Sequence, residues 1–315
     1  MMDFSIIFPG QGSQSVGMLA ELASESPLVQ ETFGQASEIL GYDLWKLTQE
    51  GPEETLGQTE HTQPALLTTG VAIYRVWRSE GGPLPIAMAG HSLGEYTALV
   101  CAGRLDFETA VGLVRDRGAA MQRAVPLGQG AMAAILGLED ERVRAACEEA
   151  ADGQIVAPAN YNCPGQVVIA GHAEAVARAV DIAAAHGARR AVVLDVSIPS
   201  HCQLMNAAAE ELARWLPDIE IRSGEIPVFH NVDAQAHAPD TEVRAALVAQ
   251  LSRPVLWSDC IRSMADRGAS CFVEMGPGKV LTGLMRRIDR GLGAAACHDP
   301  VTMRAARSEL LTEKD

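Results

Sequence analysis

Hydrophobic and polar positions fall in blocks along this chain that predict an α/β protein. The segment from Leu66 to Trp77, preceded by Pro64, is apolar enough to form a buried helix. About the last fifteen residues carry little apolar pattern, and we expect them to form a weakly anchored tail. Short apolar runs bounded by turn residues predict the buried strands of a large domain: Ser5 to Phe8, Ile86 to Ala89, and segments near Val228 and Phe272.

The middle of the chain has a different pattern. The expected elements are a strand at 131–136, a helix at 139–151, strands at 154–159 and 166–170, a helix at 173–186 and a strand at 189–196. The order β-α-β-β-α-β is typical of a ferredoxin-like unit. We therefore predict a small subdomain at 128–197, inserted into a larger α/β domain made of 1–127 and 198–315.

A candidate nucleophile lies where the predicted strand ending at Ala89 meets a helix predicted from Leu93 to Ala102. The connecting sequence Gly90-His91-Ser92-Leu93-Gly94 fits the G-x-S-x-G pattern of a nucleophile elbow, which requires a strand before it and a helix after it. Such a turn exposes the serine hydroxyl and places the next N–H at a helix N-terminus. The alternative is a glycine-rich turn in which Ser92 only caps the helix.

A serine hydroxyl needs a base to take its proton, and histidine is the usual one. His91 is adjacent to Ser92 but should point to the other side of the strand end, so it is expected to orient or pack. His201 and His230 both follow predicted strands, where active sites of α/β proteins gather. The pattern alone favours neither of these two.

Arg117 is a charged residue in an apolar setting. A helix predicted from Asp106 to about Val125 carries a stripe of apolar residues at helical spacing, and Arg117 lies beside this stripe. A buried guanidinium needs an anionic or strongly polar partner. That partner is either an internal carboxylate or a substrate carboxylate bound by the arginine fork, unless the side chain extends to solvent.

Composition narrows the function classes. The 315 residues are 48% hydrophobic and carry a formal net charge of −15. Such an acidic surface disfavours nucleic acid and anionic lipid as partners, because both bind basic patches. No apolar stretch is long enough for a membrane span, and the N-terminus does not read as a signal peptide. The seven cysteines form no C-x-x-C pair, which favours reduced thiols in the cytoplasm and no zinc site.

Several motifs occur in register along nearly the whole chain. They are Phe8-Pro9-Gly10-Gln11-Gly12-Ser13-Gln14, Gln63-Pro64-Ala65, Gly90-His91-Ser92-Leu93-Gly94-Glu95-Tyr96, Pro199-Ser200-His201 and Glu274-Met275-Gly276-Pro277-Gly278-Lys279-Val280-Leu281. With them the chain resembles the malonyl-CoA:acyl carrier protein transacylases of bacterial type II fatty acid synthesis. The resemblance implies an α/β-hydrolase-like large domain that carries the ferredoxin-like subdomain.

The resemblance also implies a role for individual residues. Ser92 matches the nucleophile, His201 the base, and Arg117 the arginine that pairs with the free carboxylate of the malonyl group. Gln250 matches the residue whose backbone carbonyl orients the histidine. Two further groups of positions follow from the same resemblance: the oxyanion-hole N–H donors Gln11 and Leu93, and the substrate-binding residues Gln63, His91, Asn160, Asn162 and Ser200.

The implied reaction moves a malonyl group from malonyl-CoA to the phosphopantetheine thiol of acyl carrier protein by a ping-pong route. It needs no metal and no other cofactor, and an acidic monomer in the cytoplasm is expected. Because acyl carrier proteins are acidic, we expect a local basic docking surface, or else a merely solvated helix face. The two candidate groups are Lys279 with Arg286, Arg287 and Arg290, and Arg189 with Arg190.

Three other functions remain open from the sequence. A serine hydrolase or thioesterase would share Ser92 and His201 but would discharge the acyl group to water, and Arg117 on an apolar face argues against a plain esterase. An acyltransferase serving a polyketide synthase would have the same chemistry and another carrier. A non-catalytic scaffold would not need Ser92, His201 and Arg117 together.

Overall fold

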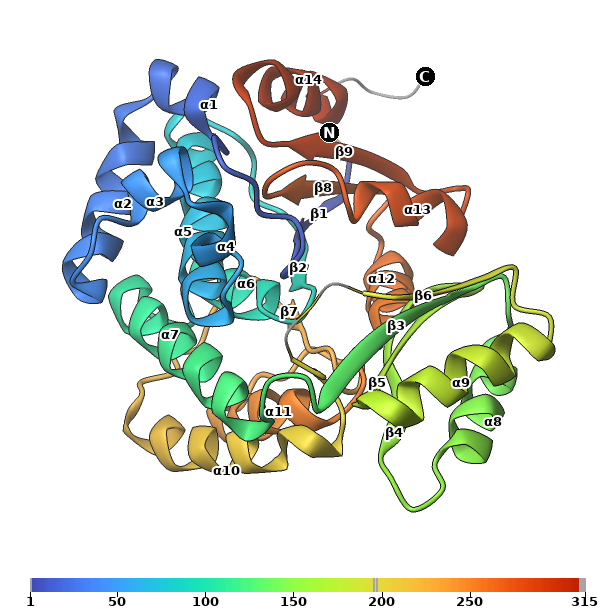
Figure 1. Cartoon of the computed structure of the whole chain (residues 1–315). Helices are drawn as coiled ribbons and strands as arrows, with labels where there is room; N and C mark the ends of the chain where they lie inside the picture. The colour runs from blue at the N-terminus through green and yellow to red at the C-terminus, as the bar shows by residue number, and fades with distance from the viewer. Residues whose placement is uncertain (1, 195, 197, 312–315) are drawn as a thin grey trace.

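The computed structural model describes residues 2–194, 196 and 198–311 (Figure 1). A five-stranded sheet with the strand order β7-β2-β1-β8-β9 forms the centre of the larger part. Every neighbouring pair in it is parallel, as expected for strands joined through helices. The strands are β1 (Phe4–Phe8), β2 (Ala87–Gly90), β7 (Val228–Phe229), β8 (Cys271–Met275) and β9 (Gly293–Cys297).

Helices cover both faces of this sheet. Because side chains alternate along a strand, Ile6 packs into one apolar cluster and Ile7 into another on the opposite face. The cluster around Ile7 is formed with α12 (Trp257–Asp266) and α13 (Thr282–Ile288). The helices on the Ile6 side include α2 (Pro27–Leu40), α5 (Thr59–Ser79), α6 (Gly94–Cys101), α7 (Phe107–Ala124), α10 (Asn206–Trp215), α11 (Asp240–Ser252) and α14 (Pro300–Leu311), with the short α1 (Ala20–Glu25), α3 (Leu44–Glu50) and α4 (Glu53–Leu56) nearby.

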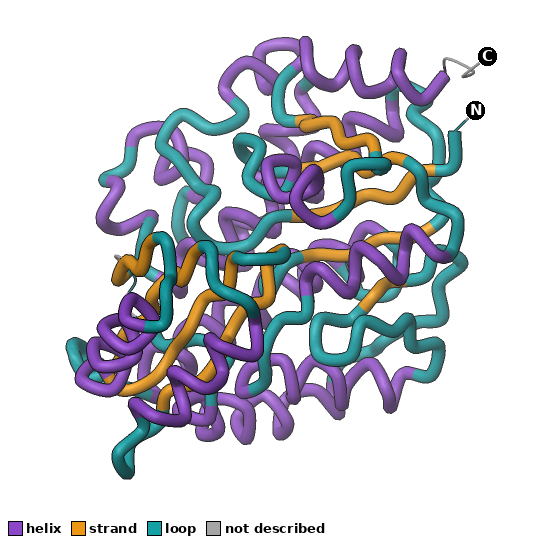
Figure 2. Tube along the Cα trace, turned by 90° about the vertical axis from the view of Figure 1, so that its right-hand side faces the viewer, coloured by secondary structure: helices purple, strands orange, loops and turns teal. Residues whose placement is uncertain are grey.

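A second sheet has four strands in the order β4-β5-β3-β6, and all neighbours are antiparallel. Two helices pack on one of its faces around Ile135, Val167 and Val176. This β-α-β-β-α-β arrangement confirms the predicted ferredoxin-like unit, and Figure 2 shows its sheet apart from the parallel one. Its elements are β3 (Gly130–Leu136), α8 (Asp140–Ala150), β4 (Val156–Cys163), β5 (Gln166–His172), α9 (Ala173–Ala185) and β6 (Arg190–Val193).

Strand β4 joins the two parts of the molecule. The Tyr161 N–H donates to the Val255 carbonyl at 2.9 Å, and the Val255 N–H donates to the Ala159 carbonyl at 2.8 Å. These bonds attach β4 to the loop before α12 and fix Asn160 and Asn162 relative to the parallel sheet. The domain bounds 128–197 stay a prediction, and Asp195 and Ser197 lie outside the described residues.

Three features differ from the predictions. The prediction of a weakly anchored tail is wrong as far as Leu311, because α14 packs Met303 and Leu310 into the core and the Leu310 carbonyl accepts from the Met2 N–H. The rest of that predicted tail, 312–315, lies outside the described residues. Strand β9 was missed because its alanines have low strand propensity, and pairing with β8 decides its conformation. Helix α5 begins at Thr59, so Pro64 lies inside it. The missing N–H of Pro64 leaves only the Glu60 carbonyl without its helical donor, and Glu60 is an exposed residue.

No described helix combines the length and the apolar character that crossing a membrane requires.

Candidate active site

The predicted elbow is present at the end of β2. Ser92 has a φ of 52°, which places it in the left-handed region at the turn between β2 and α6. The flanking glycines are required sterically. A Cβ on Gly90 would lie 1.8 Å from the Gly94 carbonyl carbon, and one on Gly94 would lie 2.3 Å from the Phe8 carbonyl oxygen. The sequence therefore forms a tight turn that lifts Ser92 away from the sheet.

His201 is the histidine that faces Ser92. Its Nε2 lies 2.7 Å from the Ser92 Oγ, and its Nδ1–H donates to the Gln250 backbone carbonyl at 2.7 Å. This pairing fixes the Nδ1–H tautomer and leaves the Nε2 lone pair toward the serine hydroxyl. The structure thus separates the two candidate histidines, because His230 is buried elsewhere and contacts Glu95.

Burial controls the protonation of His201. It lowers the pKa of this imidazole from 6.5 to about 3, although the hydrogen bond to Gln250 acts in the opposite direction. The positive charge of Arg117 and the neighbouring His91 lower this pKa further. His201 is therefore neutral and can accept a proton at neutral pH.

Arg117 is buried on α7 with only 1% of its surface exposed. Its Nη1 donates to the Gln63 side-chain oxygen at 2.8 Å, and its Nη2 donates to the Gln250 side-chain oxygen at 2.9 Å. Its guanidinium also lies 5.2 Å from the centre of the Tyr96 ring. Among the described residues no carboxylate forms an ion pair with Arg117, and none accepts from its Nε–H. The buried cation can therefore still bind an anionic ligand group.

One cavity of about 220 Å³ connects the predicted residues. Every predicted site residue except Gln250 lines it, and Gln250 contacts both His201 and Arg117 from behind. Apolar side chains such as Met121, Met132 and Val168 complete the wall. Subdomain strands β4 and β5 therefore form one side of the cavity, and the elbow forms the other.

Two backbone N–H groups lie in the same cavity wall as Ser92. Leu93 precedes the first turn of α6, and Gln11 lies in the turn after β1. Within the described part of the chain, no residue accepts a hydrogen bond from either N–H. Both donors are thus available to an oxyanion formed next to Ser92.

His91 lies in the cavity wall and contacts residues other than Ser92 and His201, which fits the expected orienting or packing role. Its Nε2–H donates to the Asn162 side-chain oxygen at 2.9 Å, and its ring packs 5.5 Å from the Trp257 ring. Burial lowers the pKa of His91, while the bond to Asn162 acts against this shift. His91 and Asn162 thereby link the elbow to strand β4.

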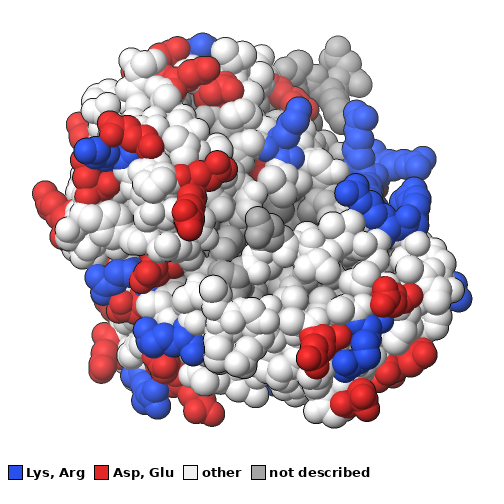
Figure 3. Space-filling view, in the orientation of Figure 1, with Lys and Arg blue, Asp and Glu red and all other residues white. Residues whose placement is uncertain are grey.

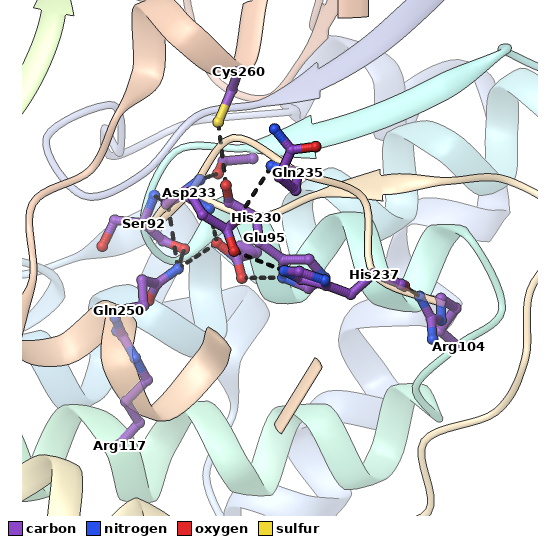
Figure 4. Close-up of polar contacts among 12 residues, drawn as sticks. Ser92, Glu95, Arg104, Arg117, His230, Asp233, Gln235, His237, Gln250 and Cys260 are labelled. Carbon is purple, nitrogen blue, oxygen red and sulfur yellow. Dashed lines mark hydrogen bonds and ion pairs between the residues drawn. The ribbon is translucent and has the colours of Figure 1, made fainter. Parts of the chain in front are cut away.

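A buried polar layer behind the elbow was missed by sequence reasoning (Figure 4). The Asn231 side-chain oxygen accepts from the Ser92 N–H at 2.7 Å, and its amide donates to the Gly90 carbonyl at 2.8 Å. Glu95, which is fully buried, accepts from His230 and from the Asn231 N–H. The signal that could have indicated this layer is Glu95, a charged residue in an otherwise uncharged helix directly after the elbow.

The two candidate basic groups meet on one surface. Arg189, Arg286, Arg287 and Arg290, here called the arginine cluster, line the same hollow together with Asp289. All four arginines are exposed, and Arg287 donates to Gln166, which also lines the active-site cavity. Figure 3 shows basic side chains gathered at one side of this face, whereas elsewhere acidic and basic side chains are interspersed among uncharged ones.

Over the described residues, His, Cys, Asp and Glu side chains form no group of three or more that could hold a metal ion.

Known proteins are similar to this chain over nearly its whole length. Residues 5–296 match the model of the acyl transferase domain family. The chain is 56% identical over 306 residues to the malonyl CoA-acyl carrier protein transacylase of Escherichia coli (strain K12), covering 97% of this chain and 99% of that protein. It is 43% identical over 316 residues to the protein of the same name from Bacillus subtilis (strain 168), covering 100% and 99%.

Solved structures with high similarity include two enzymes of this type. One is a malonyl-transacylase in complex with its holo type II PKS acyl-carrier protein, with a TM-score of 0.97, 53% identity and coverage of 98% and 99% of the two chains. The other is an acyl carrier protein S-malonyltransferase from Vibrio cholerae, with a TM-score of 0.95, 53% identity and coverage of 96% and 99%. This chain belongs to the acyl transferase domain family and, within it, to the malonyl CoA-acyl carrier protein transacylases.

Proposed function

We propose that this chain transfers a malonyl group from malonyl-CoA to the phosphopantetheine thiol of acyl carrier protein, in fatty acid biosynthesis. The observation that carries the proposal is the buried Arg117, which shares a cavity with the paired Ser92 and His201. A serine nucleophile alone would serve many acyl groups. A buried cation whose hydrogen-bond partners are neutral amides, with no carboxylate among the described residues in direct contact, selects an acyl group that brings its own carboxylate.

In the first half-reaction the malonyl carboxylate binds the guanidinium of Arg117, and the thioester carbonyl lies against Ser92. His201 takes the hydroxyl proton as the Ser92 Oγ attacks the carbonyl carbon. The oxyanion accepts hydrogen bonds from the Leu93 and Gln11 N–H groups, each typically worth about 10²–10³ in rate. The C–S bond then breaks, and His201 returns the proton to the CoA sulfur. The product is a malonyl ester on Ser92.

In the second half-reaction the carrier's phosphopantetheine thiol replaces CoA. His201 accepts the thiol proton, the sulfur attacks the ester carbonyl, and the same N–H groups hold the oxyanion. Collapse breaks the C–O bond and returns the proton to Ser92. The Gln250 carbonyl keeps the imidazole in the tautomer that both steps require, 2.7 Å from its Nδ1. Gln63 supports Arg117, while His91, Asn160, Asn162 and Ser200 line the substrate path.

The arginine cluster provides the local positive charge that docking of an acidic carrier requires. An acidic carrier and a chain of net charge −15 repel each other overall, so contact requires local positive charge. The cluster lies beside strand β5 and helix α13, and both elements also line the active-site cavity. We propose this surface as the docking site. Lys279, on the exposed turn before α13, would extend it, and Arg190 follows Arg189 at the start of β6.

A polyketide carrier is a second candidate acceptor, favoured by the solved neighbour whose partner is a type II PKS acyl-carrier protein. Transfer assays with carriers of both kinds would separate the two.

We further propose that the enzyme works as a cytoplasmic monomer without metal or other cofactor, and without nucleic acid or membrane partners. Its acidic surface and its seven buried free cysteines support this reading. The proposed domain bounds remain 1–127 with 198–315, and 128–197.

Intact-protein mass after brief mixing with malonyl-CoA tests the proposal. The wild type should gain one malonyl group, mapped to Ser92 by peptide analysis, and Ser92→Ala should gain none. Added holo acyl carrier protein should remove the group faster than water does. Loss to water at the same rate would establish a hydrolase instead, and full transfer activity in Ser92→Ala would contradict the proposed nucleophile.

A further inference from the structure

Glu95 is a buried carboxylate in the first turn of α6, three residues after Ser92. None of its surface is exposed, so its charge must be stabilised by neighbouring donors. One oxygen accepts from His230 Nδ1 at 2.7 Å, and the other accepts from the Asn231 N–H at 2.9 Å and from Gln250 Nε2 at 2.8 Å. Glu95 thus receives three hydrogen bonds, one of them from the residue that also contacts His201 and Arg117.

The contact with His230 does not remove the negative charge of Glu95. His230 donates through Nδ1, and its Nε2 has no partner among the described residues. The neutral Nδ1–H tautomer satisfies the contact and leaves only a lone pair at Nε2, whereas the charged form would bury an N–H without an acceptor. The carboxylate therefore retains a negative charge that His230 does not neutralise.

The Gln250 side chain connects this charge to Arg117. Its amide nitrogen donates to Glu95 and, at 3.0 Å, to the Ser92 carbonyl. Both of these groups can only accept, so the amide oxygen must face the other way, where Arg117 Nη2 donates to it at 2.9 Å. Figure 4 shows Gln250 lying between Arg117 and Glu95.

We propose that Glu95 is a positioning residue for acyl-group selection: it is the buried counter-charge of Arg117, held one amide away by Gln250. The proposal rests on the proposed malonyl transfer. A carboxylate in direct contact would pair with the guanidinium and occupy the donors that the substrate needs. A counter-charge across an amide stabilises the buried cation and orients it, yet leaves donors, including Nε–H, for the substrate.

The isosteric variant Glu95→Gln tests the charge. Its side chain can still accept from Asn231 and Gln250. His230 can accept from the new amide as the Nε2–H tautomer, which buries an N–H without an acceptor and lowers stability, so the rate ratio and not stability reports the charge. We expect the ratio of Ser92 acylation rates with malonyl-CoA and acetyl-CoA to fall about tenfold, a typical coupling between residues of one network. The matched control is Glu274→Gln, since Glu274 is equally buried but holds Leu281 and Thr282. It should leave the ratio within about twofold.

Two further variants separate positioning from general destabilisation. In an Arg117→Ala background, Glu95→Gln should change the malonyl-to-acetyl ratio no further, because the cation it serves is gone. Gln250→Met removes the amide that links Glu95 to Arg117 and adds no charge, so it should lower the malonyl preference even if Glu95→Gln does not fold. The backbone carbonyl that contacts His201 is unchanged by this substitution.

The outcomes are distinct. An unchanged ratio in folded Glu95→Gln, or a retained preference in Gln250→Met, would overturn the role of Glu95. An equal fall of the acylation rates with malonyl-CoA and with acetyl-CoA in Glu95→Gln would also overturn this role, because Glu95 would then have a structural role only. Absence of any malonyl adduct on the wild type would instead contradict the proposed function itself.

Discussion

The two arginine regions of this molecule differ in what surrounds the charge. Arg117 is 1% exposed and held by two neutral amide oxygens, whereas the arginine cluster faces solvent around a surface hollow. A buried charge acts at short range in a low dielectric and discriminates between ligand groups. Exposed charges act at longer range, are screened by salt, and mainly accelerate encounter. This difference supports the two proposals made above, acyl selection by Arg117 and carrier recognition by the arginine cluster.

The largest expected effect comes from removing the buried charge. Arg117→Ala should lower the kcat/KM of acylation by malonyl-CoA by about 10²–10³, because losing one partner of a buried charge pair costs about 2–5 kcal/mol. Acylation by acetyl-CoA should fall much less, since that substrate has no carboxylate. Stopped-flow or quenched-flow acylation rates with both substrates check this. An equal loss with both would remove Arg117 as the selector.

A smaller effect is expected from reversing two exposed charges. Arg286→Glu combined with Arg290→Glu should lower transfer to acyl carrier protein about tenfold at low salt, because attraction becomes repulsion. Acylation by malonyl-CoA alone should be retained, and the deficit should shrink at high salt.

The control for this pair is Arg142→Glu with Arg214→Glu, which changes net charge equally at exposed positions on α8 and α10. It should leave carrier transfer close to the wild-type rate. If the control loses as much as the cluster variant, or if both half-reactions of the cluster variant fall together, the docking surface lies elsewhere.

The smallest expected effect is on pH dependence, and it shows what burial does to the site. Burial holds the pKa of His201 at about 3, far below 6.5, so the imidazole stays neutral as pH falls from 8 to about 5. The kcat/KM of acylation should change less than about threefold over this range. A profile that halves near pH 6.5 would show that His201 titrates like an exposed histidine.

The depressed pKa of His201 also predicts that the free energy of unfolding falls as the pH falls below 6.5. The unfolded chain binds a proton on His201 near pH 6.5, whereas the folded chain does so only near pH 3. The contribution of His201 to the free energy of unfolding is therefore complete above pH 6.5 and is lost progressively as pH falls toward 3. Denaturant titrations at several pH values would measure this loss.

Short segments of the sequence were enough to predict the elbow, the buried arginine and the ferredoxin-like unit. The elbow could be predicted because such a turn requires residues without a Cβ, and Gly90 and Gly94 stand on either side of Ser92. The amphipathic pattern of α7 identified Arg117 as a misplaced charge, and period and order identified the ferredoxin-like unit. These signals lie within short segments, where each residue restricts its neighbours.

Only the tertiary structure decided which distant groups meet. From pattern alone His201 and His230 were equivalent, because each follows a strand; their different partners, Ser92 and Glu95, come from other segments. The alanine-rich β9 depends on β8, and the joining of Arg189 with Arg286 depends on how the subdomain lies against α13. The network of Glu95 and Gln250 spans 155 residues of sequence. Hydrogen bonds and ion pairs of this kind depend on distances set by the packed core, and sequence spacing does not encode them.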